Sequence, residues 1–129
     1  VALDFSGAMH QLASERLGIS AKRVKFIERS FREEAWFHEL GLFQCVVTNQ
    51  AVHELRHKAY ATTLHQQVRK ILVNGGSYLV CDHFVGDGGM SNSDLYMTIE
   101  EQKDALLAAG FTNVQQLLLK GGIVLHQAR

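Results

Sequence analysis

The stretches FQCVVTN, at Phe43–Asn49, and GSYLVCD, at Gly76–Asp82, decide the fold of this chain. Each is an apolar run of strand length that is rich in β-branched and aromatic residues. Between them lies a helical region, Ala51–Leu72, and the connection ends in Leu72-Val73-Asn74-Gly75-Gly76. Two buried strands joined by a helix typically lie parallel in one sheet, so this part of the sequence predicts an α/β fold.

The alternation of strands and helices extends toward the N-terminus. Val1–Leu3 and Val24–Ile27 are predicted strands. The helix between them is expected to begin after Ser6, a good N-cap residue, and to end at Gly18. The charged and aromatic stretch Arg29–Leu42 is predicted to be an irregular helical segment.

The same alternation continues toward the C-terminus. The helical region after the Phe43–Asn49 strand is expected to break near His57. A capping box at Thr98–Glu101 predicts a further helix, which Gly110 ends. The last signal is a β-hairpin, with Phe111–Leu119 and Ile123–Gln127 on either side of Lys120-Gly121-Gly122.

Composition limits both the size and the partners of the protein. Its 129 residues are enough for one domain, 1–129, and 47% of them are hydrophobic. The 13 basic and 13 acidic residues balance, so the charge gives no argument for nucleic-acid binding. No apolar run approaches the roughly 18 residues of a membrane helix, and no signal peptide is visible, so we expect a cytoplasmic protein. Cys45 and Cys81 are expected to be core thiols and not a disulfide.

The order of these elements, together with the closing segment Ala108–Val114 and the final hairpin, resembles a class I S-adenosylmethionine-dependent methyltransferase. The resemblance starts at the second strand of that family. It implies a three-layer Rossmann-like sheet that is mostly parallel, with an antiparallel final strand. The first strand of the family and its glycine-rich loop have no counterpart in these residues, so the domain is expected to be truncated at its N-terminus relative to the family.

The resemblance implies a binding site for S-adenosylmethionine. Asp4 matches the acidic residue that accepts hydrogen bonds from the two ribose hydroxyls, and Phe5 would form an apolar wall beside the adenine. Ser30 would accept a hydrogen bond from the adenine amino group, and Phe31 would pack against the ring. The bend after the Phe43–Asn49 strand would lie near the methionine part of the cofactor, and it consists of Asn49, Gln50 and Ala51.

Two histidines are candidate catalytic groups in this interpretation. His53 lies one turn beyond the bend, and His83 follows a strand at its carboxyl end. Methyl transfer is an in-line displacement in which the protein positions the reactants and a base can remove the proton of the acceptor. With nothing basic to suggest nucleic acid, a small molecule is the expected acceptor.

Two alternatives stay open. The motif HELRH at His53–His57 matches the H-E-x-x-H signature of zinc hydrolases, although Tyr60 and Thr63 stand where a metzincin has glycine and histidine. The other alternative is a non-catalytic remnant of the methyltransferase fold that no longer binds the cofactor. Gln44 and Asn74, where the family usually has aspartate and proline, fit this alternative. A second chain would then cover the strand edges that the missing strand leaves free, as a homodimer.

Overall fold

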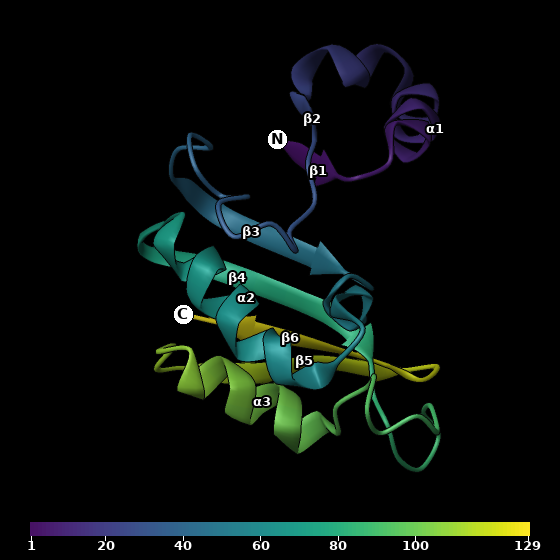
Figure 1. The fold of residues 1–129 in the computed structure, drawn as a ribbon, viewed down its shortest axis with the longest axis vertical. Helices are drawn as coiled ribbons and strands as arrows, with labels where there is room; N and C mark the ends of the chain where they lie inside the picture. The colour runs from purple at the N-terminus through teal and green to yellow at the C-terminus, as the bar shows by residue number, and fades with distance from the viewer. The chain divides into compact units, whose positions relative to one another are not determined.

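The computed structural model describes residues 1–129, and it has two compact units, Val1–His38 and Glu39–Arg129 (Figure 1). Both units contain helical and strand elements, so the predicted α/β class is confirmed. None of the helices has the length and hydropathy that a membrane crossing requires.

The first unit has a two-stranded parallel sheet beside one α-helix. Strands β1, Ala2–Asp4, and β2, Phe26–Glu28, pair in parallel. Helix α1, Gly7–Leu17, begins and ends as predicted, because the Ser6 hydroxyl accepts from the Met9 amide (3.4 Å) and Gly18 has a φ of 54°. A 3-10 segment, η1, then runs from Gly18 to Arg23. No residue of α1 is buried, so this helix leaves its apolar side chains exposed.

The helical segment predicted at Arg29–Leu42 is wrong, because residues 31–39 form a series of turns. Backbone bonds there span three residues, as in the Trp36 amide to Glu33 carbonyl contact at 3.3 Å. The Arg29 guanidinium donates to the carbonyls of Trp36 (2.7 Å) and His38 (3.0 Å), which a continuing helix would use for its own amides. Trp36 is only 5% exposed and anchors the segment as expected.

The second unit is built on a four-stranded sheet in the order β3-β4-β6-β5. Its strands are β3 (Phe43–Asn49), β4 (Leu72–His83), β5 (Val114–Lys120) and β6 (Ile123–Ala128). The predicted antiparallel final strand is confirmed, because β6 runs opposite to both β4 and β5. Because this one reversed strand has a neighbour on each side, two of the three pairings are antiparallel and only β3–β4 is parallel. The sheet is therefore mixed, and the mostly parallel sheet that we expected is found only in part.

The helices of this unit cover one face of the sheet (Figure 1). Helices α2, Ala61–Lys70, and α3, Ile99–Ala108, lie on the face to which Tyr78 and Val80 point, and these two side chains are 0% and 2% exposed. Val47 of β3 pairs with Leu79, which lies between these two residues, so its side chain points to the opposite face, and it is 61% exposed. The second unit thus has two layers by itself. The prediction that Cys45 is buried is wrong, because this cysteine lies on the same uncovered face as Val47 and is exposed.

The connection between β3 and β4 is broken as predicted. Two 3-10 turns, η2 (Val52–Leu55) and η3 (Lys58–Tyr60), precede α2. Between them Arg56 takes a left-handed conformation with a φ of 66°, which no continuous helix can contain.

Strand β4 begins at Leu72, four residues before Gly76, where the sequence predicts its start. Its pairing with β3 moves from Phe43↔Leu72 to Cys45↔Ser77, so five steps along β4 match two along β3. Gly75, with a φ of 75°, lies within this irregularity. The glycine pair therefore forms a bulge inside a long strand and not a turn before it.

The capping box and the hairpin are confirmed. The Thr98 hydroxyl accepts from the Glu101 amide (3.1 Å), and the Glu101 carboxylate accepts from the Thr98 amide (2.8 Å). Strands β5 and β6 are joined by Gly121 and Gly122, whose φ angles of 59° and 77° fit a two-residue hairpin turn.

Candidate functional site

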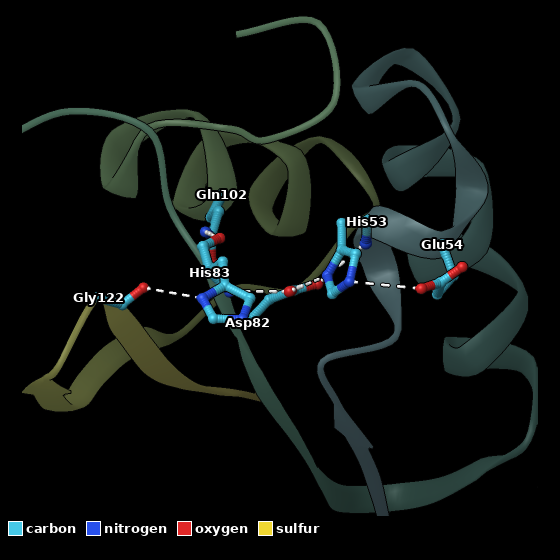
Figure 2. A network of polar contacts seen from close by, with 6 residues as sticks. All are labelled: His53, Glu54, Asp82, His83, Gln102 and Gly122. Carbon is cyan, nitrogen blue, oxygen red and sulfur yellow. Dashed lines mark hydrogen bonds and ion pairs between the residues drawn. The ribbon is translucent and has the colours of Figure 1, made fainter. Parts of the chain in front are cut away.

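Asp82 is the centre of a group of polar contacts at the carboxyl end of β4 (Figure 2). Its carboxylate is buried, with the residue 3% exposed, and it accepts three hydrogen bonds. The His53 amide donates at 3.0 Å, the His53 Nδ1 at 2.5 Å and the His83 amide at 2.8 Å. Hydrogen-bond donors of this kind offset the cost of burying a carboxylate, and the fold places three of them around Asp82.

The chain brings His53 to Asp82 through the bend after β3. Strands β3 and β4 are parallel, and β3 ends at Asn49, opposite Cys81, whereas β4 continues through Asp82 to His83. Gln50 then has a φ of 51°, and its amide donates to the Cys81 carbonyl at 2.7 Å. This left-handed residue turns the chain into η2, where His53 is the second residue. The predicted bend is therefore present, and it determines where His53 lies.

The contact with Asp82 fixes the proton position on His53. A carboxylate can only accept, so Nδ1 carries the hydrogen in this contact, and Nε2 is the nitrogen left to face other groups. The Nε2 atom lies 3.5 Å from the Glu54 carboxylate, and the His53 side chain is 16% exposed. His53 is thus an imidazole that is oriented through Nδ1 and partly accessible at its other side.

His83 and Tyr96 complete this part of the molecule. The Nδ1 of His83 donates to the Gly122 carbonyl (3.3 Å), and the Gln102 amide group donates to the His83 carbonyl (2.8 Å). A pocket is lined by residues that include His53, Asp82, His83 and Tyr96. The sequence predicted both histidines as candidates but missed Asp82 and Tyr96. The signal for Asp82 was a charged residue at the end of an apolar strand, and nothing in the sequence indicated Tyr96.

The predicted cofactor residues fall into two groups. In the first unit, Asp4 is the last residue of β1 and Phe5 follows it, while Ser30 and Phe31 come shortly after β2, and the two parallel strands end at the same edge. The Arg29 amide donates to the Asp4 carbonyl at 3.0 Å, so within this unit the residues after β1 and those after β2 are neighbours. In the second unit, the structure brings together at the end of β3 the bend residues Asn49, Gln50 and Ala51. Their roles toward a cofactor stay predictions.

The HELRH segment does not form the helix that a zinc hydrolase needs. Arg56 interrupts it, and His57 caps η3 with its Nδ1 accepting from the Ala59 amide at 3.1 Å. His53 and His57 therefore do not share one face of a helix. No group of three histidine, cysteine or acidic side chains could hold a metal ion.

A second polar cluster lies under α2, away from the Asp82 contacts. The Tyr78 hydroxyl lies 3.3 Å from the His65 Nδ1 and 3.1 Å from the Thr48 hydroxyl. Burial lowers the pKa of His65 to about 3, with a smaller contribution from His126, and burial also raises the pKa of Tyr78. Both groups are therefore neutral in the core, and we regard this cluster as structural.

Comparison with known proteins identifies the fold. No protein-family model and no curated protein matches the sequence. Among solved structures, the chain is similar to an O-methyltransferase family protein from Burkholderia thailandensis, with a TM-score of 0.71 at 18% identity over 95% of this chain and 39% of that one. It is also similar to the glycopeptide N-methyltransferase MtfA, with a TM-score of 0.74 at 16% identity over 99% and 72% of the two chains.

Human N-acetylserotonin methyltransferase, in a complex with S-adenosylmethionine, matches with a TM-score of 0.65 at 16% identity over 84% of this chain and 34% of that one. The chain spans only 42%, 41% and 30% of the length of three further matching structures. The fold of this chain therefore matches part of the fold of these methyltransferases.

Proposed function

We propose that the chain is a methyltransferase-like domain acting on a small molecule, with His53 as the base that takes a proton from the acceptor. The observation that carries the proposal is the contact between His53 and the buried Asp82 at the carboxyl ends of two parallel strands. Open α/β sheets bind their ligands at this edge. Both units are proposed to belong to one such domain.

The arrangement around His53 suits a general base. Asp82 holds the imidazole in the tautomer whose Nε2 accepts a proton, and it stabilises the imidazolium that then forms. Glu54, 3.5 Å from Nε2, adds a second negative charge on that side. His83 lies next to His53, with ring centroids 5.7 Å apart, and would orient the acceptor. When bound, S-adenosylmethionine would supply the electrophilic methyl group.

The first unit offers groups that fit the adenosine part of this cofactor. One oxygen of the Asp4 carboxylate accepts from the Ser6 amide at 2.8 Å, and the other makes no hydrogen bond within the chain. Phe5, beside it, is 64% exposed. A free carboxylate oxygen can accept from a ribose hydroxyl, and an exposed ring can pack on adenine.

Calorimetric titration with S-adenosylmethionine tests the proposal. These 129 residues contain no counterpart of the glycine-rich loop of the family, so several hydrogen bonds of about 1.5–3 kcal/mol each are missing, and for this chain by itself we expect a Kd weaker than about 0.1 mM instead of micromolar. The substitution Asp4→Asn should weaken binding further. Transfer of a labelled methyl group to small hydroxylated acceptors should require His53, with His57→Gln as the matched control for His53→Gln.

A non-catalytic domain is the second candidate, and the free edges of the sheets favour it. Strand β3 pairs only with β4, and no charged residue lies within Phe43–Asn49. An uncharged edge strand can pair with the same strand of a second copy. Absence of cofactor binding at millimolar concentration, together with a dimer in analytical ultracentrifugation that Val47→Lys dissociates, would favour this candidate over the enzyme.

A further inference from the structure

The segment between β4 and α3 is closed at its base by backbone hydrogen bonds. The Val85 amide donates to the Met97 carbonyl (3.0 Å), and the Met90 amide donates to the Phe84 carbonyl (2.7 Å). Gly89 packs so tightly that a Cβ atom there would lie 2.3 Å from the Phe84 oxygen. Both ends of the segment Phe84–Met97 are therefore held against each other.

The second half of this segment fixes the backbone of Tyr96. The side-chain oxygen of Asn92 accepts from the amides of Asp94 (3.1 Å) and Leu95 (3.2 Å). The backbone carbonyl of Asn92 accepts from the Tyr96 amide (3.0 Å). The Asp94 carbonyl accepts from the Lys58 amide at 3.0 Å, which ties the segment to η3. Tyr96 thus follows a capped turn that is attached to another part of the unit.

The ring of Tyr96 lies against both candidate histidines. Its centroid is 5.3 Å from that of His53 and 6.0 Å from that of His83. Rings at these distances attract one another and restrict one another's rotation. His53 is then held at one nitrogen by Asp82 and at its ring by Tyr96. The Tyr96 hydroxyl makes no hydrogen bond within the chain, so the contact depends on the aromatic ring.

We propose that Tyr96 is a positioning residue that keeps the His53 imidazole in the orientation in which Nδ1 donates to Asp82. Without the aromatic ring, the imidazole can rotate about its bond to Cβ, and Nε2 no longer keeps one direction toward the acceptor. The consequence for catalysis rests on the proposed function of His53 as a base. The effect on the ring itself does not.

Nuclear magnetic resonance of the full chain tests the effect on the ring directly. A hydrogen-bonded imidazole N–H exchanges slowly with water and gives a downfield proton signal, which His53→Gln assigns by its loss. We expect Tyr96→Leu to broaden or remove this signal and Tyr96→Phe to keep it. Tyr60→Leu is the matched control, because Tyr60 is 61% exposed and contacts His57 instead.

The outcomes separate this proposal from the proposed function. A signal in Tyr96→Leu with the wild-type linewidth and exchange rate would overturn the positioning role, even if the protein is a methyltransferase. Loss in Tyr96→Leu with retention in Tyr96→Phe would support it, even if no methyl transfer is found. Tyr96→Phe also decides the case if Tyr96→Leu does not fold, because loss of the signal in folded Tyr96→Phe would contradict a role for the ring alone.

Discussion

The Nζ of Lys58 lies 2.7 Å from the Oε1 of Glu101. The other carboxylate oxygen of Glu101 accepts from the Thr98 amide at the first turn of α3. One side chain thus joins η3 to the start of a helix 43 residues away in sequence. Lys58 and the Thr98 amide lower the pKa of Glu101, as expected for a carboxylate that accepts from both.

Removing the N-cap of α3 should weaken the second unit. In Thr98→Ala the Glu101 amide loses its acceptor, so we expect the free energy of unfolding to fall by about 1 kcal/mol. Urea denaturation measures the change. Thr63→Ala, on the exposed side of α2, should change it by less than about 0.5 kcal/mol. Equal losses in the two variants would contradict the importance of the cap.

Leu106 and Leu107 are neighbours on α3 with opposite environments. Leu106 is 0% exposed and Leu107 is 41% exposed. Leu106→Ala should leave a cavity between α3 and the sheet and lower the free energy of unfolding by about 2–5 kcal/mol. Leu107→Ala should cost less than about 1 kcal/mol, since it removes a partly solvated side chain. If Leu107→Ala lowers the stability more than Leu106→Ala in thermal and urea unfolding, the face of α3 that packs on the sheet is not the one that contains Leu106.

Asp82 should be required for stability as well as for the proposed chemistry. Asp82→Ala leaves the amides of His53 and His83 without their acceptor inside the fold. Each unsatisfied buried donor costs about 1–3 kcal/mol, so we expect a loss of about 2–5 kcal/mol in chemical denaturation. Asp87→Ala, in the exposed loop, serves as the control. A variant as stable as the control would show that these contacts do not form in solution.

The buried histidines should make the protein sensitive to acid. Burial lowers the pKa of both His65, to about 3, and His126 below their usual value. A histidine in the unfolded chain takes up its proton near pH 6.5, so the stabilising contribution of each buried neutral histidine is complete above that pH and falls below it. For His65 the loss continues as the pH falls toward 3. Each such histidine adds a slope of about 1.4 kcal/mol per pH unit to the free energy of unfolding within its window.

His126→Leu tests this linkage. His126 is 1% exposed, and its Nδ1 has no hydrogen-bond partner, so the substitution removes a titrating group at little other cost. Unfolding measured between pH 6.5 and 4.5 should show a shallower slope than in the wild type. His57→Leu, at an exposed position, should keep the wild-type slope, and a shallower slope there would count against burial as the cause.

Local signals in the sequence predicted the elements well. The bounds of β3, the capping box at Thr98 and the turn between β5 and β6 agree with the structure, because each depends on residues close together in the chain. The bulge at Gly75 was not predicted. The same glycine suits a turn or a bulge, and only the pairing of β4 with β3 decides between them.

The site was harder to predict because it depends on contacts between distant residues. The exposure of Cys45 follows from which face of the sheet α2 and α3 cover, which an apolar strand pattern does not reveal. His53 could be predicted from its place after a strand. Its partner Asp82 lies 29 residues further on, and Tyr96, which contacts His53 and His83, belongs to a segment without regular structure.

The position of β6 between β4 and β5 has a consequence for how the second unit folds. Strand β5 comes before β6 in the sequence but pairs only with β6. It can therefore join the sheet only after β6 has paired with β4. Deleting Ile123–Ala128 would therefore release two strands at once, whereas loss of an edge strand would release only itself. Completion of the sheet depends on β6, which follows β4 and β5 in the sequence, and this favours one cooperative step over stepwise addition of strands along the chain.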